Sequence, residues 1–288
     1  MDMYERALGL LPPEIRDAGA RYTGKNVEEI RLRLDRKPAI LTQQCEIEIC
    51  DAPLKKESLE LVLERACSAS IHAHIDEMSR GYLNHRGLRI GFGASAVMKD
   101  GHIASFKDFT SLNIRIPSVF CGEIDEIYRI LKTDSTGNII IVSPPGGGKT
   151  TLLRELIRRF SNEGVRVAVA DERNEIGASC QGRNYFDLGS HTDVLVGLDK
   201  KTSAMLLLRG MNPQMIALDE ISHSKDMETV FDIVGCGVRI LATAHGTNVQ
   251  ELKKRELYRI LLNERIFTDA VIIDNSSNGR KYTHKRLI

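Results

Sequence analysis

The chain has 288 residues, with 40 basic and 39 acidic side chains and a formal net charge of +1. This length suits two domains and allows a sizeable core without disulfide or metal crosslinks. The near-neutral charge excludes a general electrostatic attraction to nucleic acid or anionic lipid, and 5% aromatic residues without Trp disfavour a base-stacking surface. No apolar run approaches the roughly 18 residues that cross a bilayer, and the first residues are charged. We therefore expect a cytoplasmic protein without a signal peptide.

The first part of the chain, residues 1–120, predicts a smaller α+β N-terminal domain. Helices are expected over 4–11, 13–18 and 54–68, and strands over 29–34, 38–41, 88–92, 95–98 and 111–116. Charged and apolar residues alternate over 29–34, which is the period of a strand. Asp100-Gly101 between two apolar runs predicts a hairpin, and Pro117 limits the strand before it.

The second part, residues 121–288, alternates strand and helix patterns. Strands are expected over 138–142, 165–170, 214–218 and 239–244, and helices over 149–160, 202–208, 225–234 and 249–262. Residues 270–273 and 280–286 are expected as edge strands. Such alternation predicts an α/β fold with a mostly parallel sheet.

A glycine-rich segment lies between the first of these strands and the first of these helices. It reads Ser143-Pro144-Pro145-Gly146-Gly147-Gly148-Lys149-Thr150-Thr151. Its end matches the motif G-x-x-x-x-G-K-[ST], with Ser143 in place of the first glycine. In such a loop the backbone amides cradle phosphates, Lys149 reaches the β- and γ-phosphates and the Thr150 hydroxyl coordinates Mg²⁺. The segment predicts a RecA-like P-loop ATPase domain, with a chance glycine-rich turn as the alternative.

Three other predicted strands end in polar residues. Residues 214–218 lead to Asp219-Glu220, residues 165–170 lead to Asp171-Glu172, and residues 239–244 lead to His245. Ligands of open α/β sheets bind beyond the carboxyl ends of the strands, so these groups are expected at one edge. We assign Asp219 to the Mg²⁺ shell, Glu220 to activation of the attacking water, and His245 to sensing the γ-phosphate or its water. For each group alone, a helix cap or a satisfied polar residue is the alternative.

The sequence specifies less closely which nucleotide binds and which cationic side chain stabilises the transition state of its hydrolysis. No Asn-Lys-x-Asp guanine reader occurs, which favours ATP over GTP. Phosphoryl transfer needs positive charge in the transition state. Four arginines near the ends of predicted elements are candidates for this positive charge: Arg115, Arg173, Arg183 and Arg209. For each of them, a surface ion pair is the alternative. A basic tail over 280–286 is either solvated or a contact for a membrane protein or lipid headgroups.

Together, the loop, the acidic cluster after the next strand, the Asp-Glu strand and the later His resemble the type II/IV secretion ATPase superfamily. Several sequence segments resemble more closely the family of stage III sporulation protein AA, a stand-alone branch of the superfamily from endospore-forming bacteria. They span nearly the whole chain in order: residues 28–33, 111–116, 143–154, 171–176 and 192–195. The acidic cluster reads Asp-Glu-Arg instead of the Glu-Asp-Pro of pilus motors, and no tetracysteine zinc site is present.

The resemblance implies an ATP-hydrolysing motor, with Mg²⁺, for the channel between mother cell and forespore. It implies a peripheral protein on the mother-cell side of the membrane, in contact with membrane subunits of the channel, and a homo-oligomer, usually a hexamer. It also raises Arg115 above the other arginines, since the matching segment in the superfamily carries an arginine that reaches the nucleotide. Either Glu172 or Glu220 is then the main catalytic carboxylate.

Two other functions are compatible with a P-loop domain. One is a nucleic-acid-stimulated RecA-like ATPase, against which the neutral charge and few aromatic residues argue. The other is a degenerate P-loop protein that binds nucleotide only to assemble a complex, against which the intact Lys149, Thr150, Asp219 and Glu220 argue. We expect no nucleic-acid partner.

Overall fold

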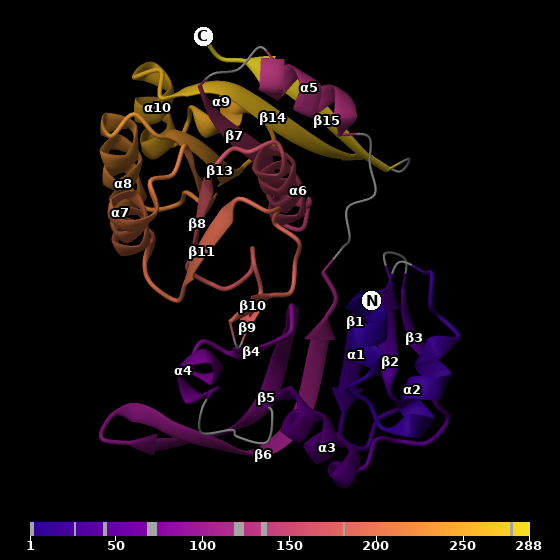
Figure 1. Ribbon diagram of the computed structural model, residues 1–288. Coiled ribbons are helices and arrows are strands. Elements are labelled where there is room, and N and C mark those ends of the chain that lie inside the picture. Colours follow the sequence, from indigo (N-terminus) through magenta and orange to yellow (C-terminus); the bar gives the residue numbers. More distant parts are fainter. Residues whose placement is uncertain are drawn as a thin grey trace. The chain divides into compact units, whose positions relative to one another are not determined.

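The computed structural model describes residues 3–25, 27–42, 45–67, 74–117, 124–133, 137–180, 182–276 and 279–288. The chain divides into two compact units, Met1–Ser118 and Val119–Ile288 (Figure 1). Within the described residues, no helix combines the length and the apolar character that a membrane span requires.

Unit 1 contains a six-stranded antiparallel sheet with the strand order β3-β2-β1-β6-β5-β4. Its strands are β1 (Val27–Arg33), β2 (Ala39–Thr42), β3 (Glu46–Glu48), β4 (Tyr82–His85), β5 (Leu88–Lys99) and β6 (His102–Arg115). Its helices are α1 (Met3–Leu8), α2 (Pro13–Ala20), α3 (Lys56–Ala66) and α4 (Ile75–Met78). The hairpin at Asp100-Gly101 is confirmed, because both residues have positive φ and Lys99 pairs with His102.

Unit 2 contains a seven-stranded sheet with the order β11-β8-β12-β13-β7-β14-β15, parallel throughout except for the last pair. Its strands are β7 (Asn138–Ser143), β8 (Val167–Asp171), β11 (Thr192–Val196), β12 (Met215–Glu220), β13 (Arg239–His245), β14 (Phe267–Ser276) and β15 (Gly279–Arg286). A separate small ribbon pairs β9 (Ser179–Cys180) with β10 (Arg183–Asn184). The predicted α/β class with a mostly parallel sheet is confirmed.

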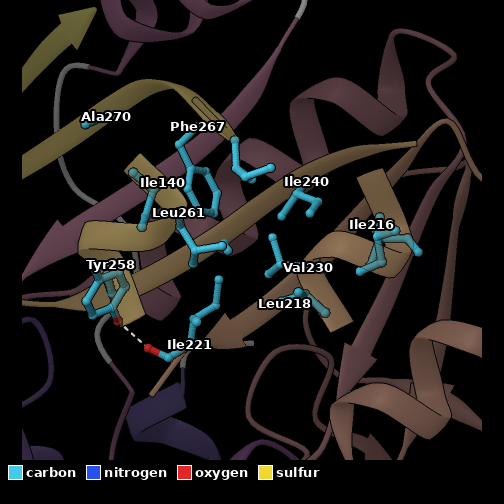
Figure 2. Packing of buried hydrophobic residues seen from close by; sticks show 14 of the residues in the cluster. Ile140, Ile216, Leu218, Ile221, Val230, Ile240, Tyr258, Leu261, Phe267 and Ala270 are labelled. Atoms are coloured by element: carbon cyan, nitrogen blue, oxygen red, sulfur yellow. Dashed lines mark hydrogen bonds between the residues drawn. The ribbon is translucent and has the colours of Figure 1, made fainter. Parts of the chain in front are cut away.

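Helices cover both faces of this sheet. They are α5 (Asp125–Thr133), α6 (Lys149–Asn162), α7 (Lys200–Met211), α8 (Ser224–Gly235), α9 (Val249–Leu252) and α10 (Glu256–Asn263). Successive side chains of a strand point to opposite faces, so Ile139 and Ile141 pack against α5 and α6. Ile140 and Val142 pack toward α7, α8, α9 and α10 (Figures 1 and 2). Two apolar cores, one on each face of the sheet, thus hold the parallel strands together.

Two expectations from the sequence are wrong. The single helix expected over 249–262 is two helices, although Leu252, Tyr258 and Leu261 are all buried as its period requires. The amides of Lys254 and Arg255 donate to carbonyls three residues back instead of four. Arg255 then adopts an extended conformation, at the end of an exposed run of three basic residues. Residues 270–273 belong to an interior strand, since β14 pairs with β7 on one side and β15 on the other.

Candidate nucleotide site

The predicted phosphate loop connects β7 to α6 and turns on its glycines. Gly146 and Gly148 have φ of 68° and 95°, values that glycine adopts without strain. A Cβ added to Gly147 would lie 1.7 Å from the hydroxyl oxygen of Ser143, which is fully buried. The Ser143 side chain therefore occupies the interior of the loop, and the absence of a side chain at Gly147 makes room for it.

Lys149 is held inside this loop. Its ammonium donates hydrogen bonds to the carbonyl oxygens of Ser143 at 3.1 Å and Pro144 at 3.2 Å. Burial lowers its pKa, while the negative charges of Glu220 and Asp219 act in the opposite direction. Within the described part of the chain, no side chain caps the amides that begin α6, so these amides are suited to binding an anion.

The strand order brings the other predicted residues to the same edge of the sheet. β13 lies between β7 and β12, so His245 is level with Ser143, and Glu220 is level with Thr243. β8 flanks β12 on its far side, which brings Glu172 to the neighbouring strand end. Lys149, Asp219, Glu220, Glu172 and His245 thus all lie at the carboxyl edge of the sheet.

Asp171 and Glu172 have different environments in spite of being adjacent. The Asp171 carboxylate is 1% exposed and accepts backbone hydrogen bonds from Glu175 at 2.8 Å, Ile176 at 3.0 Å and Gly177 at 2.8 Å. Burial raises its pKa against the effect of those bonds. Asp171 therefore organises the loop after β8, while the side chain of Glu172 is 40% exposed.

Asp219 lies where negative charge accumulates. Burial, followed by the charges of Glu175 and Asp171, raises the pKa of Asp219 to about 6. The positive charge of Lys200 acts in the opposite direction on Asp219.

A second cation, Arg154 of α6, lies in the field of Asp171 and Asp219, and burial lowers its pKa to about 10. Its guanidinium carbon lies 3.9 Å from the centre of the Phe186 ring, and its Nε has no hydrogen-bond partner among the residues that the structure describes. Arg154 is not among the site residues predicted from the sequence, because nothing in the helical pattern separates it from a surface arginine.

The segment after Glu220 is fixed to the core. The Tyr258 hydroxyl of α10 donates a hydrogen bond to the backbone carbonyl of Ile221, drawn as a dashed line in Figure 2. Ile221 itself packs in the cluster that includes Leu218 and Val230 (Figure 2). The backbone on the far side of Glu220 is therefore held by both a hydrogen bond and apolar packing.

The candidate arginines fall into two groups. Arg115, at the end of β6 in unit 1, is 60% exposed and lies 3.6 Å from Glu29. The three candidates in unit 2 are also exposed: Arg173, Arg183 and Arg209.

An additional arginine lies at the loop. The guanidinium carbon of Arg280 would be 2.8 Å from a Cβ added to Gly148. From the sequence, Arg280 is expected in an edge strand and a basic tail, with no role at the loop. The edge strand is confirmed as β15 (Gly279–Arg286), and the proximity of Arg280 to the loop follows from non-local pairing.

A magnesium ion is compatible with the donors at this edge. The hydroxyl of Thr150 and the carboxylate of Asp219 are hard oxygen ligands of the kind that Mg²⁺ prefers. Burial disfavours the charge of Asp219, and a bound cation would relieve that penalty. These residues fit the ion that the P-loop motif implies.

The α/β fold, with a glycine-rich loop between β7 and α6, resembles that of solved ATPases. The ATPase DotB of Legionella pneumophila matches with a TM-score of 0.61 at 14% identity, covering 98% of this chain and 78% of DotB. The pilus retraction motor PilT, solved with bound ADP, matches with a TM-score of 0.62 at 14% identity, covering 92% of this chain and 80% of PilT. At this identity the likeness concerns the fold.

The chain belongs to the family Sporulation stage III, protein AA, whose model matches residues 8–283. Stage III sporulation protein AA of Bacillus subtilis (strain 168) is 30% identical over 248 residues, or 84% of this chain and 80% of that protein. The protein SEEDLING PLASTID DEVELOPMENT 1 of Arabidopsis thaliana is 24% identical over 258 residues, covering 88% of this chain and 35% of the plant protein. The chain thus spans about a third of this second relative.

Proposed function

We propose that the protein hydrolyses ATP to ADP and phosphate at the carboxyl edge of the seven-stranded sheet. The observation that carries the proposal is the position of β13, whose His245 lies between the phosphate loop and the Asp219-Glu220 strand end. A helix cap would explain one polar strand end, but it does not explain several at one edge beside a lysine loop.

In the proposed reaction, the oxygen of a water molecule attacks the γ-phosphorus and the bond from that phosphorus to the ADP oxygen breaks. Glu220 or Glu172 accepts the proton of the water. Lys149 binds the β- and γ-phosphates after exchanging its present carbonyl partners for them. Mg²⁺ held by Thr150 and Asp219 would neutralise charge on the phosphates. Arg115 stabilises the transition state, and His245 responds to the γ-phosphate.

We assign this activity to the motor of a secretion-type channel between mother cell and forespore. Membership of the sporulation family and the secretion-ATPase fold support this role. The protein would work as a homo-oligomer, a hexamer by analogy with the superfamily. It would sit on the cytoplasmic, mother-cell side of the membrane and dock on membrane subunits of the channel.

The ATPase rate of the wild type and of Lys149→Ala, with and without single-stranded DNA, tests the activity. We expect turnover that is independent of DNA and falls at least about a hundredfold in Lys149→Ala, because the lysine is lost from the phosphates. Lys253→Ala, which changes an exposed lysine beyond α9, is the matched control and should keep the wild-type rate.

His245→Ala should slow hydrolysis more than it weakens ATP binding, because the proposed role of His245 is to respond to the γ-phosphate.

Two results would redirect the proposal. Strong stimulation by DNA would favour a nucleic-acid-dependent ATPase. Nucleotide binding without turnover, at every protein concentration, would favour a structural role for the nucleotide. An equal loss of binding and turnover in His245→Ala would remove the sensing role from that residue.

A further inference from the structure

Lys200, the first residue of α7, is a lysine with little access to solvent. Its side chain is 11% exposed, whereas that of its neighbour Lys201 is 48% exposed. The Lys200 ammonium lies 3.1 Å from a carboxylate oxygen of Glu172 and 3.7 Å from one of Asp226. Removing a lysine from water is costly unless carboxylates compensate it, so this position is defined by its two partners.

The second partner is fixed on its own account. One carboxylate oxygen of Asp226 accepts hydrogen bonds from the amides of Ser222 at 2.7 Å and His223 at 2.9 Å. Its other oxygen is the one nearest Lys200. Asp226 thereby caps the start of α8, and the capped segment begins two residues after Glu220. Lys200 is therefore attached to a rigid part of the molecule.

The first partner has fewer constraints. Glu172 follows the strand β8, and its side chain is 40% exposed. The adjacent Asp171 uses its carboxylate to hold the loop backbone. Within the described residues, the Glu172 carboxylate instead accepts a hydrogen bond from the Lys200 ammonium at 3.1 Å. Lys200 thus connects the segment after β8 to the segment after β12, the two segments that carry the candidate catalytic carboxylates.

We propose that Lys200 is a positioning residue for ATP hydrolysis, which holds the Glu172 carboxylate against the capped start of α8 in the orientation required for turnover. This inference rests on the proposed ATPase function. A fixed carboxylate loses no orientational freedom when the water is activated, so its effect is on turnover and not on nucleotide binding. Lys200 acts through Glu172, without contact with the nucleotide.

The test compares kcat and KM for ATP in Lys200→Met, Lys200→Arg, Glu172→Ala and the double variant Lys200→Met/Glu172→Ala. We expect Lys200→Met to lower kcat by about tenfold or more with KM within about twofold, and Lys200→Arg to recover much of the rate. The double variant should be no slower than Glu172→Ala. Lys201→Met, which removes the adjacent exposed lysine that pairs with Glu228 at 2.8 Å, is the control and should keep the wild-type kcat.

Three kinetic results would overturn the proposal: an unchanged kcat in Lys200→Met, a rise in KM as large as the fall in kcat, or losses that multiply in the double variant. A rise in KM as large as the fall in kcat would indicate direct contact of Lys200 with phosphate.

Unfolding in urea gives a measurement that is independent of turnover. In urea unfolding, the midpoint shift of the double variant should be smaller than the sum of the single shifts, and additive shifts would show that the contact is absent. Absence of turnover in the wild type would contradict the proposed function itself, and urea unfolding would still decide whether Lys200 holds Glu172.

Discussion

At the scale of single residues, the phosphate loop depends on two positions that compensate each other. Ser143 carries a side chain where the P-loop motif has glycine, and its hydroxyl donates to the Pro144 carbonyl at 3.2 Å. That hydroxyl occupies the space that a side chain at Gly147 would need. The departure from the motif at 143 is therefore accommodated by the glycine four residues later.

We predict that Gly147→Ala lowers nucleotide affinity by about tenfold or more, because the new Cβ and the Ser143 hydroxyl cannot both fit in the loop. Adding Ser143→Gly should restore most of the affinity, since it removes the atom in conflict. Titration with a fluorescent ATP analogue measures both effects. Gly210→Ala is the control, because a Cβ there meets nothing within 4 Å and the residue lies in helix α7. No recovery in the double variant would contradict the coupling.

At the scale of elements, the ends of β8 and β12 crowd acidic groups into a poorly solvated edge. The pKa of Asp219 rises from 3.8 to about 6, first through burial and then through Glu175 and Asp171. The folded state therefore binds a proton more tightly than the unfolded state. In the absence of metal, the contribution of Asp219 to the stability of the fold therefore becomes less favourable as pH rises from about 4 to about 6, and its full cost is present above that range.

We predict that Asp219→Asn stabilises the metal-free protein at pH 7.5 and has little effect near pH 4. The pKa difference corresponds to at most about 3 kcal/mol, and the partial exposure of Asp219 reduces this limit. Urea unfolding with a chelator at both pH values measures the gain. Asp193→Asn, an exposed carboxylate on β11, should change stability by less than about 0.5 kcal/mol at either pH. An equal gain at pH 4 and pH 7.5 would show that ionisation of Asp219 is not the cause.

Elements were more predictable from the sequence than their neighbours in space. The apolar run before Ser143 and the Asp-Gly turn at residues 100–101 identify a buried strand and a hairpin, because both signals are local. The position of β13 between β7 and β12 results from non-local strand pairing. The sequence therefore predicts that His245 lies at the edge of the sheet, but it does not predict that His245 lies between the loop and Glu220. The contact of Lys200 with Glu172, 28 residues apart, was inaccessible for the same reason.

At the scale of the whole molecule, the candidate site residues are divided between two compact units. Unit 2 carries the phosphate loop, the acidic strand ends and His245, with its own cores on both faces of the sheet. Unit 1 carries Arg115, on a strand whose neighbours are fixed by the pairing of Ile30 and Ile90 with Ile114. Under the proposed function, unit 2 alone binds the nucleotide. Rapid hydrolysis additionally requires Arg115 of unit 1.

We predict that Arg115→Ala lowers kcat by on the order of a thousandfold while the affinity for ATP stays within about twofold, because the arginine acts on the charge of the transition state. Arg36→Ala, an exposed arginine in the turn after β1, should keep the wild-type rate. Residues 119–288 expressed alone should bind ATP and show a kcat as low as that of full-length Arg115→Ala. Comparison of single-turnover rates with equilibrium binding separates the two steps. If Arg115→Ala keeps the rate of Arg36→Ala while residues 119–288 alone are slow, the assignment of Arg115 is wrong. Unit 1 would then accelerate hydrolysis through another residue.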